Sequence, residues 1–152
     1  MKRALFVLIL MGCGGDAVGP SSSPPPPPPP PAPFQLAFSA VVTSKGFNAV
    51  ANREECRYSV TAVASGGSSG EFALWNTYDW EFRHPDGTVQ SIFATQSESV
   101  DFWGSDRLMY SSSRTANRIA WHPTKKFTLF YTFRYTLITG EQRSQFLSID
   151  CI

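Results

Sequence analysis

The sequence predicts an all-β fold, an antiparallel β-sandwich of about seven strands with one disulfide, in residues 34–152. Three observations predict it. Apolar and polar residues alternate along most of this region, as they do in half-buried strands, and helical periodicity is scarce. Turn-forming residues separate the alternating runs. Two of the three cysteines, Cys56 and Cys151, lie within the region.

Five runs alternate clearly and are the main expected strands. Their inward-facing residues are Phe34, Leu36, Phe38, Ala40 and Val42; Cys56, Tyr58, Val60, Ala62 and Ala64; Phe72, Leu74, Tyr78, Trp80 and Phe82; Phe127, Leu129, Tyr131, Phe133, Tyr135 and Leu137; and Leu147, Ile149 and Cys151. Weaker strands are expected at residues 88–94 and 98–103. Residues 44–55 are expected to hold one helical turn. Residues 104–126 are expected to form a long loop with a short strand near residues 119–121.

The connections between these strands have turn chemistry. Serine and glycine fill residues 65–70, which predicts a loop. In residues 84–87 (His-Pro-Asp-Gly), proline suits the first central position of a turn and glycine tolerates a positive φ, so a hairpin turn is expected. Residues 139–141 predict another tight connection.

The first thirteen residues have the pattern of an export signal. Lys2 and Arg3 precede an apolar run over residues 4–11, which is too short to span a bilayer and suits a signal peptide. Residues 10–13 (Leu-Met-Gly-Cys) resemble the lipobox of bacterial lipoproteins, in which a signal peptidase cuts before the cysteine. The alternatives are an ordinary signal peptide with an incidental cysteine, or a short N-terminal anchor. The small and polar residues that follow disfavour both.

This resemblance implies that residues 1–12 are removed and that Cys13 carries fatty acyl chains. Two or three such chains would hold the protein on a membrane essentially permanently, because each buried methylene contributes about 0.8 kcal/mol. Gly14 occupies the position at which lipoproteins retained at the inner membrane carry aspartate. The resemblance therefore implies the outer membrane, at its periplasmic face or at the cell surface.

A proline-rich segment connects the predicted anchor to the domain. Eight consecutive prolines at residues 24–31 lack backbone donors and favour polyproline II. At about 3.1 Å per residue, this run spans roughly 25 Å. We expect residues 13–33 to be a spacer that holds the domain away from a surface. The alternative is a proline-rich ligand for the aromatic groove of a partner.

In architecture, residues 34–152 resemble immunoglobulin-like and fibronectin-like sandwiches. In such a sandwich the first and last strands run parallel, so the start of the second strand and the end of the last lie at one end. Cys56 opens the second expected strand and Cys151 ends the last. A bond between these cysteines is therefore expected, with a contribution of about 4–5 kcal/mol in the chain-entropy model. Trp80 is the expected core tryptophan of the third strand.

Composition and spacing argue against several kinds of chemistry. With 13 Lys+Arg against 12 Asp+Glu, the net charge is only +1, which argues against a polybasic nucleic-acid binder. The two histidines, His84 and His122, lie in no spaced ligand cluster, so neither a metal nor a cofactor is predicted. Asp79 and Glu81 share one strand face, where a hydrated surface near Arg83 is expected rather than a catalytic pair.

Aromatic and basic residues together form the candidate binding surface. Trp75 and Phe130 alternate with inward-facing residues and are expected to point outward. Residues 105–126 contain five basic residues and one acidic residue. We predict a binding surface made of Trp75, Trp103, Trp121 and Arg118. The alternative is that the tryptophans cap the core and the lysines protect an edge or a loop.

These features predict a non-enzymatic, membrane-anchored module that binds or scaffolds a protein or a glycan of the cell envelope. One alternative is a hydrolase of envelope polymers that uses Asp79, Glu81 or His84. Another is an inhibitor or accessory subunit of an envelope complex, which would carry a flat apolar patch.

Overall fold

The computed structural model describes residues 25–152; the predicted signal peptide and Cys13 lie outside the described residues. The described chain forms eight strands and one helix. In order, they are β1 (Gln35–Asn48), β2 (Arg53–Ser65), β3 (Phe72–Arg83), β4 (Val89–Ala94), α1 (Gln96–Trp103), β5 (Arg107–Met109), β6 (Ser113–His122), β7 (Thr128–Leu137) and β8 (Gln142–Asp150). Within residues 25–152, no helix has the length and apolar character needed to cross a bilayer.

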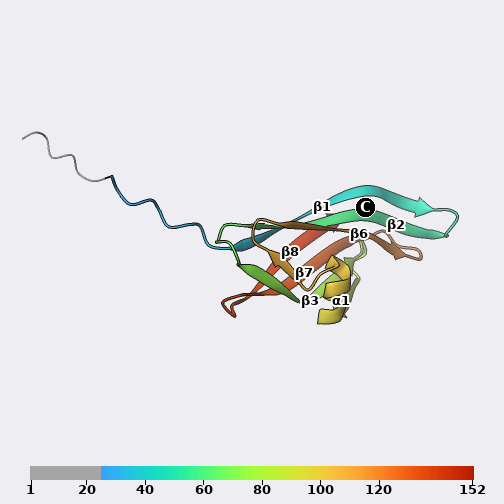
Figure 1. Ribbon diagram of the computed structural model, residues 1–152. Coiled ribbons are helices and arrows are strands. Elements are labelled where there is room, and N and C mark those ends of the chain that lie inside the picture. Colours follow the sequence, from blue (N-terminus) through green and yellow to red (C-terminus); the bar gives the residue numbers. More distant parts are fainter. Residues whose placement is uncertain (1–24) are drawn as a thin grey trace, which may run out of the picture.

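The strands form two antiparallel sheets that face each other across the core (Figure 1). One sheet has the order β1-β2-β6, and the other has the order β4-β3-β7-β8, with the short β5 paired to the start of β3. The predicted antiparallel β-sandwich is therefore confirmed. Phe38 on one sheet stacks on Phe133 of the other, with 4.9 Å between ring centroids, so aromatic rings fill the space between the layers.

Buried side chains alternate strictly with less buried ones over most of β2 and in β7, where the sequence pattern was clearest. Every second residue of β2 is buried, from Cys56 to Ala64, and the same holds in β7 from Leu129 to Leu137. Full burial of one large apolar side chain contributes about 1.5–3 kcal/mol, so these two central strands fix which face of each sheet points inward.

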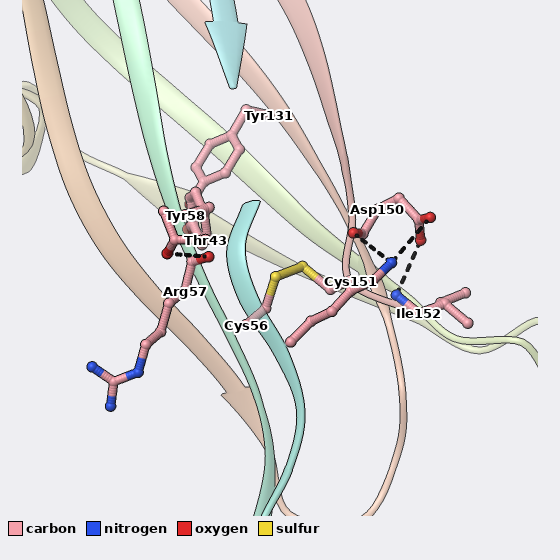
Figure 2. The surroundings of a disulfide bond; sticks show 9 residues. Thr43, Cys56, Arg57, Tyr58, Tyr131, Asp150, Cys151 and Ile152 are labelled. Carbon is pink, nitrogen blue, oxygen red and sulfur yellow. Dashed lines mark hydrogen bonds and ion pairs between the residues drawn. A yellow bond between two sulfur atoms is a disulfide. The ribbon is translucent and has the colours of Figure 1, made fainter. Parts of the chain in front are cut away.

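At one side of the sandwich, here called the closed flank, β1 lies beside β8. The two strands run in the same direction, because Arg143 at the start of β8 donates to the Phe34 carbonyl (3.3 Å), while Lys45 near the end of β1 pairs with Asp150 (3.4 Å). This arrangement brings the start of β2 to the end of β8. The predicted disulfide between Cys56 and Cys151 is confirmed, with Cα atoms 5.6 Å apart (Figure 2).

The strand directions define two ends of the domain. The tether end holds the start of β1, and the distal end holds the β1–β2 turn (Figure 1). At the tether end the Gly67 N–H donates to the Ala32 carbonyl (2.6 Å), which attaches the last residues of the proline-rich segment to the β2–β3 loop. The distal end also holds the β3–β4 turn and the β6–β7 loop. The turns predicted at residues 84–87 and 139–141 both connect paired strands, as expected.

Two local expectations were wrong near the chain's turns. The helical turn expected within residues 44–55 is a hairpin, because β1 continues to Asn48, whose side-chain oxygen accepts the N–H groups of Val50 and Ala51 (both 3.1 Å). The strand expected at residues 98–103 is α1. There a side chain–backbone capping box between Thr95 and Glu98 starts the helix and overrides the weak alternation.

A β-bulge in β3 reverses the predicted orientation of its first half. The pairing with β7 shifts register between Trp75 and Tyr78, where two residues of β3 lie opposite one residue of β7, so one extra residue changes which side chains point inward. Trp75, which was expected to point outward, is 1% exposed, and Leu74 is the residue turned away from the core. After the bulge the predicted orientation holds, and Phe82 is buried.

The segment expected as a long loop, residues 104–126, instead holds β5 and all of β6. The short strand expected near residues 119–121 is the last part of β6. Its inward-facing residues include Ala116 and Ala120, which are too small to produce a clear alternating pattern.

Candidate binding groove

Opposite the closed flank lies an open flank, where the edge strands β4 and β6 face each other without pairing. Within the described chain, β4 pairs only with β3, and β6 pairs only with β2. A groove of about 480 Å³ lies between these edges, within the size range of ligand sites in proteins. It is lined by Trp80, Phe82, Gln90, Ile92, Ile119, Ala120, Trp121, His122 and Pro123.

Register explains why apolar side chains line this groove. Trp80 and Phe82 point inward on β3 after the bulge, and their partners on β4 are Ile92 and Gln90. Trp80 lies 5.0 Å from Phe82 and stacks on Tyr131, with 6.2 Å between centroids. Since β4 ends its sheet, no further strand of residues 25–152 covers these residues, and Trp80 and Ile92 are only partly buried.

The helix closes the other half of the open flank. The α1 residues Phe102 and Trp103 are buried, and Arg118 of β6 lies over the Phe102 ring at 4.3 Å. The Arg118 guanidinium also donates to the Phe102 carbonyl at the end of the helix. One half of the flank is therefore filled by aromatic side chains of α1, and the distal half remains open as the groove.

Trp121 forms an exposed rim of the groove. Its side chain is 49% exposed, and the Arg53 guanidinium lies 4.7 Å from its ring centroid. Arg53 also pairs with Glu55 (2.6 Å). Hydrogen bonds from Asn48 and then from Arg53 lower the pKa of the Glu55 carboxyl. Glu55 is therefore ionised at neutral pH and balances the positive charge of Arg53 beside the Trp121 ring.

The two histidines meet at the distal end of the groove. Their ring centroids lie 4.7 Å apart, and the rings meet edge to face with an interplanar angle of 65°. His84 is buried and donates from Nδ1 to the Lys126 carbonyl (2.9 Å). His122 accepts at Nδ1 from the backbone N–H groups of Lys125 (2.9 Å) and Thr124 (3.2 Å). Both rings therefore have hydrogen-bonded structural roles, as expected for them.

The predicted four-residue binding surface does not form. Trp75 and Trp103 are 1% and 4% exposed and stack on each other in the core at 4.8 Å. The bulge buries the first, and the helix, with inward positions Ser99, Phe102 and Trp103, buries the second. Trp121 is on the surface. Arg118 is half-buried against α1, which is a different place on β6.

Of the two other aromatic residues singled out in the sequence, Phe130 lies as expected and Trp80 does not. Phe130 does point away from the core, and Arg83 lies 3.9 Å from its ring centroid. Trp80, expected as the core tryptophan of the third strand, lines the groove instead, and Trp75 is the tryptophan fully buried in that strand.

The carboxylates considered for catalysis lie outside the groove. Asp79 and Glu81 are on the outer face of β3, and each pairs with an arginine: Asp79 with Arg134 (2.6 Å) and Glu81 with Arg83 (2.8 Å). His84 is directed inward against His122 instead. The three residues considered for a hydrolase are therefore not brought together. Within residues 25–152, no group of three metal-ligating side chains converges.

Sequence reasoning missed the groove itself. Ile92 and Gln90 belong to a weakly patterned strand, and Ile119 and His122 belong to the segment expected as a long loop with only a short strand near residues 119–121. No local motif marks a gap between two sheet edges, because the gap depends on strand order. The capping box at Thr95, by contrast, was visible as Thr-x-x-Glu and would have identified the helix that limits the groove.

Comparisons with known proteins identify the fold and nothing more specific. No protein-family profile and no curated protein sequence matches the chain. A crystal structure from Bordetella pertussis, whose assignment as ApaA is itself provisional, matches with a TM-score of 0.58 and 12% identity over 78% of this chain and 94% of that chain. The structural genomics target SoR45 matches with a TM-score of 0.50 and 10% identity, over 77% and 86% of the two chains. At such identities the likeness concerns architecture alone.

Proposed function

We propose that this chain is a lipid-anchored protein of the bacterial cell envelope whose β-sandwich binds a segment of another protein in the groove of the open flank. The observation that supports this most is the placement of groove and tether. The groove reaches the distal end, whereas the proline-rich segment joins the tether end, where Gly67 holds Ala32. A domain anchored through Cys13 would present the groove away from its membrane.

The chemistry of the groove favours a protein segment over a glycan. Trp80, Phe82 and Ile92 offer apolar surface, and His122 is the one titratable residue in the lining. A sugar would need several polar groups to pair its hydroxyls. An uncharged, apolar peptide segment matches the lining, and it could also pair its backbone with the free edge of β4 or β6, as extended peptides do with sheet edges.

The anchor is tested by comparing the full-length protein with a Cys13→Ser variant. Cells grown with an alkyne-tagged fatty acid should label the wild-type protein and leave the variant unlabelled. Mass spectrometry of the mature protein should find a lipid-modified N-terminal peptide that begins at residue 13. A mature protein that keeps residues 1–12, or that takes up no label, contradicts the anchor.

The groove is tested with two surface variants. Trp121→Asp places a charge on the groove rim, and Phe146→Asp places the same charge on the outer face of β8, where Phe146 is 79% exposed. Each would be purified with its partners from detergent-solubilised membranes. We expect one co-purifying protein to be lost with Trp121→Asp and kept with Phe146→Asp. Retention in both variants would exclude the groove as the contact.

A further inference from the structure

His122 holds the loop that forms one end of the groove. Its Nδ1 atom is the acceptor for two successive backbone N–H groups, those of Thr124 (3.2 Å) and Lys125 (2.9 Å). Pro123, between the ring and these donors, also lines the groove. The β6–β7 loop is thus folded back onto the imidazole of the last residue of β6.

This arrangement requires a neutral ring. An imidazole nitrogen accepts a hydrogen bond only while it carries no proton, and in the charged form both ring nitrogens are donors. Protonation of His122 at Nδ1 would therefore remove both hydrogen bonds at once and set a donor against two donors. In the neutral tautomer that the structure requires, Nε2 already carries the proton of the ring, so a further proton can be added only at Nδ1.

The titratable neighbours of His122 come from three elements. The β3–β4 connection contributes His84, with its ring 4.7 Å away, and Asp86. The loop contributes Lys125, which pairs with Asp86 (2.7 Å), and Lys126. On β2, Glu54 is the cross-strand partner of His122. The strand β4 contributes no titratable side chain.

We propose that His122 is an acid-sensitive latch, whose protonation releases the β6–β7 loop and so opens the distal end of the groove. The claim that this latch regulates ligand binding rests on the proposed function of the groove. The release of the loop is a property of the fold alone and can be measured without a ligand.

The direction of the pH dependence follows from the surroundings of the ring. Burial first, and then the positive charges of His84 and Lys125, lower the pKa of His122 below its ordinary value of 6.5, with Asp86 opposing them. His122 therefore binds a proton more readily when the loop is released than when the loop is held against its ring. The latch is therefore fully stable above about pH 6.5 and weakens as the pH falls toward the lowered pKa.

Nuclear magnetic resonance of the mature chain, made with Cys13→Ser so that no lipid is attached, tests the latch. Hydrogen exchange of the Thr124 and Lys125 amides would be measured between pH 8 and pH 5 and corrected for intrinsic rates, with the His122 ring signal followed in parallel. We expect protection at high pH. Protection should fall about tenfold for every unit by which the fold lowers the pKa of His122.

Two variants separate the latch from general acid unfolding. His122→Asn keeps a side-chain oxygen near the position of Nδ1 and cannot be protonated, so both amides should stay protected down to pH 5. His84→Asn keeps a donor for the Lys126 carbonyl and removes a group that lowers the pKa of His122, so the ring should titrate at higher pH and the fall in protection should be smaller. An acid transition that persists in His122→Asn, or amides that stay protected while the wild-type ring titrates, would overturn the proposal.

Discussion

The two flanks of the sandwich differ in how the gap between the sheets is closed. On the closed flank, β1 and β8 run side by side, and a disulfide, an ion pair and an arginine–carbonyl contact connect the sheets. On the open flank, β4 and β6 do not pair with each other in the described chain, and one helix fills only half of the space between them. The contacts that link the two sheets therefore lie on the closed flank, and the exposed apolar surface lies on the opposite, open flank of the same core.

Loss of the disulfide should have the largest effect, because it removes the covalent link of the closed flank. The bond closes a loop with a sequence separation of 95, so the Cys56→Ala/Cys151→Ala variant should lose about 4–5 kcal/mol of unfolding free energy. Urea unfolding followed by tryptophan fluorescence measures this. Reduction of the wild-type protein is the control and should produce a similar loss. A change below about 1 kcal/mol would mean that packing alone closes this flank.

A second prediction contrasts two tryptophans of the open flank. Trp103→Ala removes a buried ring from the filled half, where it stacks on Trp75, and should cost about 3–5 kcal/mol. Trp121→Ala removes a half-exposed ring from the groove rim and should change stability by about 0.5 kcal/mol or less. Urea unfolding of the two variants compares them directly. Equal losses would remove the distinction between the filled and the open half.

A third prediction concerns the tether end. Gly66 and Gly140 both have positive φ values, 67° and 85°, so alanine strains the backbone at each. At Gly66 a methyl group would also collide with the Pro33 carbonyl, whereas nothing lies within 4 Å at Gly140. Thermal unfolding should therefore show a loss of about 2–3 kcal/mol for Gly66→Ala and about 1 kcal/mol for Gly140→Ala. If Gly140→Ala is equally harmful, the contact with the tether contributes nothing.

The smallest expected effect concerns the helix that limits the groove. Thr95→Ala removes the N-cap oxygen of α1 and should cost about 1 kcal/mol. Ser97→Ala, within the same first turn, removes a hydroxyl with no capping role and should leave the unfolding free energy unchanged. Chemical denaturation measures both variants. If Ser97→Ala lowers stability as much as Thr95→Ala, the capping box does not determine where the helix begins.

The sequence predicted those parts of the fold in which one residue pattern decides the outcome. The buried positions of β2 and β7, and the bond between Cys56 and Cys151, follow from strict alternation and from an expected strand order. Prediction was wrong for Trp75, because a bulge changes orientation without breaking the apolar pattern. It was wrong for residues 98–103, because capping by Thr95 outweighs a short alternation.

The candidate site was harder to predict than the fold. Of the four residues proposed for a binding surface, two tryptophans pack against each other inside the core, and only Trp121 lies on the rim of the groove. The groove arises because β4 and β6 end their sheets at the same flank. That property belongs to the order of the strands, and no single segment of the sequence contains it.

Site-specific photo-crosslinking in living cells tests most directly whether the open flank is the binding flank. Gln90 and Ser91 are adjacent, exposed residues of β4; the first lines the groove with its partner Phe82, and the second lies on the outer face opposite Glu81. A photoreactive amino acid would replace each in turn. We predict a protein adduct from position 90 and none from position 91. Adducts of the same size from both positions, or from position 91 alone, would contradict the account.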